Sequence, residues 1–117
     1  MAATPPDLRL LDLCAAADVP PGTMKLCDVE DEMVLVTNLG GEFHAAQGVC
    51  THEYFELDRG VLTGDSILCT LHLSRFSLID GEVTDPPADL PLVIYPVVVE
   101  GGRVLIQVPA GPLDVNR

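Results

Sequence analysis

The sequence predicts an all-β protein built from antiparallel sheets. Its apolar runs are short, rich in Val, Ile and Leu, and separated by turn residues, and no stretch has the periodicity of a long amphipathic helix. Residue pairs that suit tight hairpin turns recur between these runs: Gly40-Gly41, Gly64-Asp65, Asp80-Gly81 and Gly101-Gly102. Because strands joined by tight hairpins pair antiparallel, an antiparallel all-β fold follows.

Each expected strand is a short apolar run that stops where turn residues begin. In chain order the expected strands are 8–14, 23–29, 33–38, 42–47, 61–63, 66–69, 75–79, 82–84, 92–99 and 103–108. One short helical piece is expected over residues 15–18. Residues 1–6 (MAATPP) and 109–117 (PAGPLDVNR) lack periodicity, so we expect both ends to be loosely held.

The chain length predicts a single domain. A chain of 117 residues can bury an adequate core without relying on disulfides. We expect one domain over 1–117, ordered over about 7–108. Both Cys/His pairs of the chain fall within 48–90, which predicts a small metal-bearing subdomain of about 48–90 inserted into a β-sheet base.

Composition narrows the possible partners and the compartment. Six Lys and Arg residues stand against eighteen Asp and Glu residues, giving a formal net charge of -12. This charge would repel nucleic acid and favours basic protein partners, although acidity can also serve solubility alone. With no apolar run of membrane-spanning length, we expect a cytoplasmic protein without a membrane anchor.

Two Cys/His pairs are the main chemical signal in the sequence. Cys50-Thr51-His52 and Cys69-Thr70-Leu71-His72 are separated by sixteen residues, 53–68, which suit a strand, a turn and a returning strand. Such a hairpin would bring both pairs to one end of the molecule. In a cytoplasmic setting the thiols stay reduced, so the pattern predicts a metal site and not disulfides. The remaining cysteines, Cys14 and Cys27, are expected to be buried small residues.

The order of the four residues bears on the metal. Two sulfur and two nitrogen ligands suit tetrahedral zinc, but the usual zinc pattern groups its cysteines and its histidines separately. Here they alternate, which suits a binuclear centre in which each loop gives one ligand to each metal. A [2Fe-2S] cluster with two cysteines on one iron and two histidines on the other, the Rieske arrangement, has this form. Zinc remains the alternative at this point.

The stretch from Asp12 to Val108 resembles the small Rieske-type ferredoxins of bacterial aromatic-ring-hydroxylating dioxygenase systems, such as those of biphenyl, naphthalene or carbazole dioxygenase. The matching residues are Cys50-Thr51-His52, Asp58-Arg59-Gly60, Leu62-Thr63-Gly64-Asp65, Cys69-Thr70-Leu71-His72, Arg75-Phe76, Gly81-Glu82-Val83, Pro86-Pro87-Ala88, Tyr95-Pro96-Val97 and Arg103-Val104. The resemblance implies the Rieske iron-sulfur fold, with antiparallel sheets forming a base and a small inserted cluster-binding subdomain.

The resemblance also implies one Rieske-type [2Fe-2S] cluster and the roles of its ligands. Cys50 and Cys69 would bind the inner iron, and His52 and His72 the outer iron near the surface. Residues expected around the cluster are Leu71, Leu73, Ser74, Phe76, Pro86 and Pro87. Pro86-Pro87 matches a loop that shields the cluster in this family. Phe76 stands where high-potential relatives have a tyrosine and cannot donate a hydrogen bond, whereas Ser74 either contacts a sulfur or satisfies its own turn.

The function implied is soluble electron transfer without a catalytic site. The chain would be a monomer that accepts one electron from an NAD(P)H- and flavin-dependent ferredoxin reductase and passes it to a terminal Rieske non-haem iron oxygenase. After the two ligand histidines only His44 remains, which is too few for the two-histidine, one-carboxylate iron site of an oxygenase. The alternatives are a zinc-stabilised, non-redox binding module and a small Rieske subunit of another reductase, such as nitrite reductase.

Four residues beside the first pair are candidates for partner docking. Glu53 and Glu56 could steer a basic partner, and Tyr54 and Phe55 could add apolar contact area. One of two adjacent strand residues normally points inward, so we expect one of the two aromatic side chains to face the core.

Overall fold

The computed structural model describes residues 8–51, 54–71, 73–88 and 90–116, and it confirms the all-β, antiparallel prediction. The described part of the chain contains no α-helix. Its helical content is two single 3₁₀ turns, η1 (Ala16–Asp18) and η2 (Leu57–Arg59), and the first lies within the predicted helical piece. None of the helices described is long and apolar enough to cross a membrane.

The described residues form three antiparallel sheets. The outer sheet has the order β1 (Leu8–Ala15), β11 (Arg103–Pro109), β10 (Val97–Glu100). The central sheet has the order β2 (Met24–Val29), β3 (Glu32–Leu39), β4 (Glu42–Gln47), β9 (Ile94–Tyr95). The site sheet has the order β5 (Val61–Thr63), β6 (Ser66–Cys69), β7 (Ser74–Ser77), β8 (Val83–Asp85).

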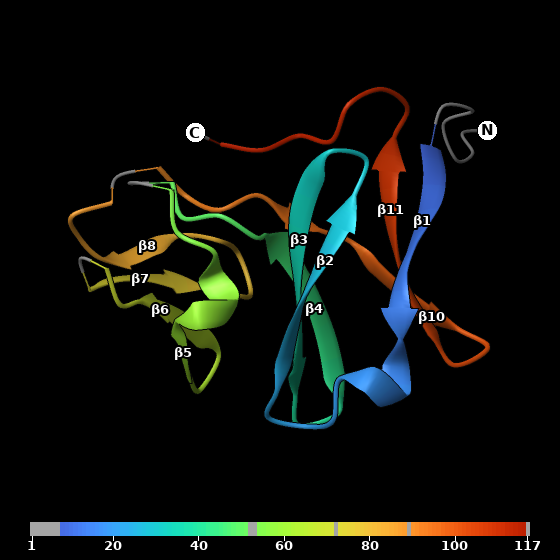
Figure 1. Ribbon diagram of the computed structural model, residues 1–117, viewed down its shortest axis with the longest axis horizontal. Coiled ribbons are helices and arrows are strands. Elements are labelled where there is room, and N and C mark those ends of the chain that lie inside the picture. The colour runs from blue at the N-terminus through green and yellow to red at the C-terminus, as the bar shows by residue number, and fades with distance from the viewer. Residues whose placement is uncertain (1–7, 52–53, 72, 89, 117) are drawn as a thin grey trace.

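The central sheet lies between the other two, as Figure 1 shows, and its strand β3 is buried on both faces. Val34 and Val36 of β3 belong to an apolar core shared with the outer sheet, which we call the base core. Leu35 belongs to a second apolar core shared with the site sheet, the site core. Burial on both faces explains why β3 carries the unbroken apolar run Met33 to Val36 and not an alternating pattern.

One predicted strand, 92–99, is wrong as a single element. In the structure this run is divided into β9 and β10, which belong to different sheets, with Pro96 between them. Proline has no backbone N–H to donate to a neighbouring strand and restricts the backbone, so it marks the point where the chain leaves one sheet for the next. The buried residues of this run, Leu92 and Tyr95, lie before the crossing, whereas the valines of β10 are partly buried or exposed.

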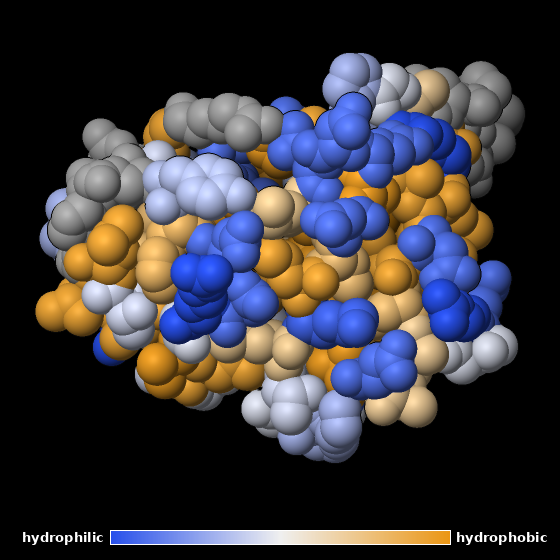
Figure 2. Space-filling view, in the orientation of Figure 1, coloured by the Kyte–Doolittle hydropathy of each residue, from blue (hydrophilic) through white to orange (hydrophobic). Residues whose placement is uncertain are grey.

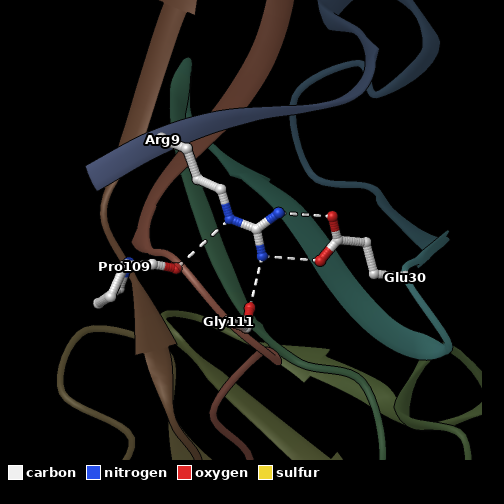
Figure 3. Close-up of polar contacts among 4 residues, drawn as sticks. All are labelled: Arg9, Glu30, Pro109 and Gly111. Atoms are coloured by element: carbon white, nitrogen blue, oxygen red, sulfur yellow. Dashed lines mark hydrogen bonds and ion pairs between the residues drawn. The ribbon is translucent and has the colours of Figure 1, made fainter. Parts of the chain in front are cut away.

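The C-terminal residues after β11 are held by the fold, which their lack of periodicity did not indicate. Arg9 of β1 forms a bidentate ion pair with Glu30, with N–O distances of 2.7 and 2.8 Å. The same guanidinium donates to the carbonyl oxygen of Gly111 at 2.6 Å and to that of Pro109 at 3.4 Å (Figure 3). It thereby joins β1, the β2–β3 turn and the start of the C-terminal segment. The hydrogen bond with Glu30 raises the pKa of Arg9 and lowers the pKa of Glu30.

Cys14 and Cys27 are buried in the base core, as predicted. Their side chains come from β1 and β2 and form a thiol–thiol hydrogen bond. Burial raises the pKa of both thiols above the ordinary value, that of Cys27 to about 12. Because the thiolate is the reactive form, both cysteines are chemically quiet structural residues in the folded chain.

This leads to a prediction about thiol reactivity. At pH 9 a thiol with a pKa of about 12 is ionised in roughly one molecule in a thousand, whereas a thiol with the ordinary pKa near 9 is about half ionised. We therefore expect Cys27 to resist alkylation in the folded protein from pH 7 to pH 9 and to react readily after denaturation. Mass spectrometry of the alkylated peptides measures both rates. Rapid modification of folded protein at pH 9 would contradict the burial of this pair.

Candidate metal centre

The first Cys/His pair lies in a short loop that leaves the central sheet after β4. Gly48 donates its N–H to the Met33 carbonyl oxygen at 2.8 Å, and Leu57 donates to the Gly48 carbonyl oxygen at 2.8 Å. Val49 and Glu56 form a β-bridge, and Cys50 donates its N–H to the Phe55 carbonyl oxygen at 3.0 Å. These bonds close a narrow finger over residues 48–57, in which Cys50 is only 6% exposed.

Close backbone packing at the base of this finger requires glycine. A Cβ atom on Gly48 would lie 2.5 Å from Leu26 Cδ1 and 2.9 Å from the Met33 carbonyl oxygen. The contact with a backbone oxygen cannot be relieved by a side-chain rotation. Any larger residue at position 48 would therefore push the first loop away from the central sheet.

The second Cys/His pair lies on the hairpin between β6 and β7. Cys69, the last residue of β6, stands directly opposite Ser74, the first residue of β7, and is 2% exposed. The hairpin connection includes Leu73, whose φ is 64°, a left-handed conformation that costs energy for a leucine. This residue is 63% exposed, so packing of its side chain does not explain the conformation.

The two loops meet because η2 packs the first against the second. Leu57 is completely buried in the site core, and this core also contains Cys50 and Cys69. Neither cysteine is in a disulfide. Two thiols from separate loops, those of Cys50 and Cys69, therefore lie in one apolar core. His52, Glu53 and His72 lie outside the described residues.

A third loop, between β8 and β9, is bonded to both cysteine loops. The Thr51 hydroxyl donates to the Leu90 carbonyl oxygen at 2.6 Å, and the Ala88 N–H donates to Ser74 Oγ at 3.0 Å. Ser74 and Ala88 are both buried. We call this third loop the proline loop because it contains Pro86 and Pro87, which were predicted to lie around the cluster. Both prolines are exposed on the outside of this loop. As an acceptor, the Ser74 hydroxyl anchors the proline loop through the Ala88 N–H.

The other predicted neighbours of the site divide into buried and exposed residues. Phe76 is fully buried in the site core, whereas Leu71 and Leu73 are 46% and 63% exposed. Tyr54 is 68% exposed, and its hydroxyl donates to Glu56 at 3.1 Å, which raises the pKa of Tyr54. Phe55 packs against the site core. The two aromatic residues therefore point in different directions, Tyr54 outward and Phe55 inward.

His44, the one histidine within the described residues, lies on β4. Its Nε2 is 3.0 Å from Glu42 Oε1, a partner on the same strand. The contact gives the imidazole a polar partner within the central sheet.

The donor set at this end of the molecule fits an iron-sulfur cluster. Thiolate sulfur is a soft ligand that binds iron in such clusters, and the two cysteines are held in an apolar core from which water is largely excluded. The sequence places one histidine two residues after the first cysteine and one three residues after the second. Two buried thiols, each followed by a histidine within three residues of sequence, match the mixed ligation that the alternating order suggested.

Comparison with known protein families identifies the fold and its cofactor. The sequence model of the Rieske [2Fe-2S] domain matches residues 9–96. The chain belongs to this family. It therefore carries a Rieske-type [2Fe-2S] cluster, and the zinc alternative from the sequence analysis is wrong.

Two relatives are ferredoxin components of oxygenase systems. The ferredoxin component of biphenyl 2,3-dioxygenase from Rhodococcus jostii (strain RHA1) is 36% identical over 104 residues, 89% of this chain and 97% of the relative. The ferredoxin component of the alkene monooxygenase system of Xanthobacter autotrophicus (strain ATCC BAA-1158 / Py2) is 41% identical over 101 residues, 86% of this chain and 82% of the relative.

Solved structures agree with the family assignment. The ferredoxin of carbazole 1,9a-dioxygenase from Nocardioides aromaticivorans IC177 superposes with a TM-score of 0.78 at 31% identity, covering 83% of this chain and 95% of that one. A ferredoxin in a complex of reduced oxygenase and oxidised ferredoxin of carbazole 1,9a-dioxygenase gives 0.77 at 34% identity, covering 83% and 91%.

Sequence reasoning missed two polar residues that organise the site, Thr51 and Gln47. Thr51 stands between the predicted ligands Cys50 and His52, and this position in the ligand motif was the one indication in the sequence that it belongs to the site. Gln47 is 3% exposed and bonded through its side chain to four backbone groups, but a single polar residue at the end of an apolar strand gave no sign of this.

Replacing Ser74 tests how the proline loop is held. In Ser74→Ala the buried Ala88 N–H loses its acceptor, which costs about 1–3 kcal/mol. We expect the midpoint of thermal unfolding of the cluster-loaded protein, followed by visible absorbance, to fall by about 5 °C or more.

Ser77→Ala on the same strand is the matched control. Ser77 Oγ accepts from the N–H of Ile79, a residue that is 51% exposed, so water can replace the lost bond. A shift of about 2 °C or less is expected. Equal shifts in the two variants would show that the bond to Ala88 has no special role.

Proposed function

We propose that this chain is a one-electron carrier that takes an electron from an NAD(P)H- and flavin-dependent ferredoxin reductase and delivers it to the terminal oxygenase of an aromatic-ring-hydroxylating system. It has no catalytic site of its own and works as a cytoplasmic monomer. It forms a single domain whose residues 48–90 make up the cluster-binding part.

In this proposal four side chains hold the cluster. Cys50 and Cys69 bind the inner iron, and His52 and His72 bind the outer iron. The cluster supplies reversible one-electron chemistry, and mixed ligation places its potential within roughly -150 to +300 mV. Support for the sulfur ligands comes from their position: both thiols are buried in the site core and neither is in a disulfide.

The protein around the ligands excludes water and leaves one side apolar. Phe76 and Leu57 fill the site core behind the cysteines, and neither is accessible to solvent. In front, Leu71 and Leu73 are exposed on the β6–β7 hairpin, and Leu90 is exposed on the proline loop. Figure 2 shows apolar surface at this end of the molecule, beside the site sheet.

These exposed apolar residues are the observation that carries the proposal. We call Tyr54, Leu71, Leu73 and Leu90 the apolar tip; all four are exposed in the monomer. Exposed apolar side chains next to a redox centre suit brief association with successive partners, since redox encounters are small and transient. Glu56, Asp58 and the formal charge of -12 would attract a basic partner and increase the association rate.

The comparisons support the partner named in the proposal. The structure with a TM-score of 0.77 contains a ferredoxin together with its oxygenase, and the relative from Rhodococcus jostii is named as a biphenyl dioxygenase component. The relative from Xanthobacter autotrophicus is named as part of an alkene monooxygenase system. The experiment below therefore compares both classes of oxygenase.

Reconstitution tests the function directly. Purified chain carrying its cluster is mixed with an NADH-dependent ferredoxin reductase and a ring-hydroxylating oxygenase, and oxygenase reduction is followed under anaerobic conditions. We expect reduction to require this chain, and the reduced chain to give the low average g value of a mixed Cys/His cluster in EPR. Cys50→Ala and His72→Ala are the controls: neither should assemble the cluster or support reduction. Transfer only to an alkene monooxygenase would overturn the aromatic assignment while keeping the carrier role.

A substitution in the apolar tip tests the docking surface. Leu73→Asn removes an exposed apolar side chain, and asparagine tolerates the positive φ at this position. We expect the second-order rate of electron transfer to the oxygenase to fall roughly three- to tenfold, with the EPR spectrum unchanged.

Val99→Asn is the matched control for this variant. Val99 is 48% exposed on β10, in the outer sheet, so the rate should stay the same. If the Leu73 variant keeps the full rate, docking does not use the apolar tip.

A further inference from the structure

The last described residues of the chain form a strap across the central sheet. This C-terminal strap, residues 110–116, leaves β11 and runs past the end of the central sheet toward the loops of the site (Figure 1). It lies outside residues 9–96, the part that matches the family. Arg9 holds its start (Figure 3), and in its middle Leu113 is buried and the Tyr95 hydroxyl donates to the Asp114 carbonyl oxygen at 2.6 Å.

Gln47, the last residue of β4, receives the end of the strap. Its Oε1 accepts from the Asn116 N–H at 3.0 Å, and its Nε2 donates to the Asn116 carbonyl oxygen at 2.8 Å. The amide side chain thus pairs with a backbone unit in the way that a neighbouring strand would. Because Gln47 is 3% exposed, water cannot readily replace these bonds.

The same amide is bonded to the first cysteine loop. Gln47 Nε2 also donates to the carbonyl oxygen of Val49 at 3.1 Å, and Val49 immediately precedes Cys50. Gln47 Oε1 also accepts from the N–H of Val93 at 2.8 Å, where the proline loop returns to the central sheet. The two donor hydrogens and both acceptor sites of this side chain are therefore in use.

A second bond connects the strap to the proline loop. Asn116 Nδ2 donates to the Pro91 carbonyl oxygen at 2.8 Å. Asn116 and Val115 also form part of the lining of a groove of about 280 Å³ that reaches Cys50 and Thr51. The end of the strap is therefore a wall of a partly open groove that reaches Cys50.

We propose that the C-terminal strap is a positioning element for the metal centre, and that it acts through Gln47. By fixing the Gln47 amide, the strap holds Val49 and with it the backbone of Cys50, and it limits the access of water to the sulfur of that residue. Gln47 is the positioning residue in this arrangement. The role rests on the cluster and its Cys50 ligand, and it does not depend on which redox partners the chain serves.

The experiment removes the end of the strap and leaves the rest of the chain intact. Deletion of residues 115–117 removes the three Asn116 hydrogen bonds, two with Gln47 and one with Pro91, and keeps the carbonyl oxygen of Asp114 that Tyr95 uses. Gln47→Leu removes the other half of the pair. The controls are deletion of residue 117 alone, which lies outside the described residues, and Arg9→Gln, which removes hydrogen bonds at the far end of the strap.

Three measurements on the cluster-loaded chain report the result. The first is the rate at which visible absorbance is lost in the presence of an iron chelator; we expect it to rise about five- to thirtyfold in the 115–117 deletion, the effect of losing one or two net hydrogen bonds. The second is amide hydrogen exchange, which should increase at Cys50 and Val93. The third is the reduction potential, which should rise, because water near the sulfur favours the reduced, more negatively charged cluster.

The double variant separates positioning from general stability. If the strap acts through Gln47, Gln47→Leu should add little to the chelation rate of the 115–117 deletion. Should Gln47→Leu fail to fold, the 115–117 deletion alone still tests the proposal, because it leaves every side chain of the two apolar cores unchanged. Wild-type chelation rate and potential in the deletion would overturn the proposal, and so would equal effects in Arg9→Gln. Since no partner protein is present, a negative result here leaves the reconstitution test unaffected.

Discussion

Burial of strand β3 of the central sheet on both faces is the constraint from which the rest of the structure follows. One face covers the base core, and the other covers the site core that contains Cys50 and Cys69. A strand in such a position has no solvent side, so polar groups near it must find partners within the protein. Asn38 and Gln47 do so on β3 and β4: Asn38 donates to the Val19 carbonyl oxygen, and Gln47 binds four backbone groups.

The loops around the candidate cluster are held by a few side-chain to backbone hydrogen bonds and not by sheet pairing. Thr51 and Ser74 bind the proline loop, and Gln47 binds the strap. Such bonds are individually modest, yet each buried partner left without its bond costs more than the bond itself contributes. This asymmetry explains how loops without regular structure can hold ligands in fixed positions: opening one loop exposes unsatisfied groups in the next.

The sequence predicted those features that depend on local pattern. Strand positions, hairpin turns and the two cysteine loops follow from apolar runs, glycine pairs and ligand spacing, and the structure reproduces most of them within one or two residues. The division of 92–99 at Pro96 was missed because composition reports burial but not which sheet a strand joins. The strap was missed for a related reason: its attachments to Arg9, Tyr95 and Gln47 are contacts between residues 19 to 102 positions apart, and no local periodicity encodes them.

An electron carrier of this kind must meet two opposing demands at one site. The cysteine sulfurs need a dry, rigid setting, because water and motion favour loss of the metal and change its potential. The electron must nevertheless leave through a surface that partners can approach closely. In this chain the demands are met on different sides of the three loops: Cys50, Cys69 and Phe76 face the site core, while Leu71, Leu73 and Tyr54 face outward.

The left-handed backbone of Leu73 belongs to this division, since it lies where the chain turns from the exposed loop into buried Ser74. The strained residue therefore lies at the boundary between the buried side of the site, which holds the cysteines, and the exposed side, which a partner would contact.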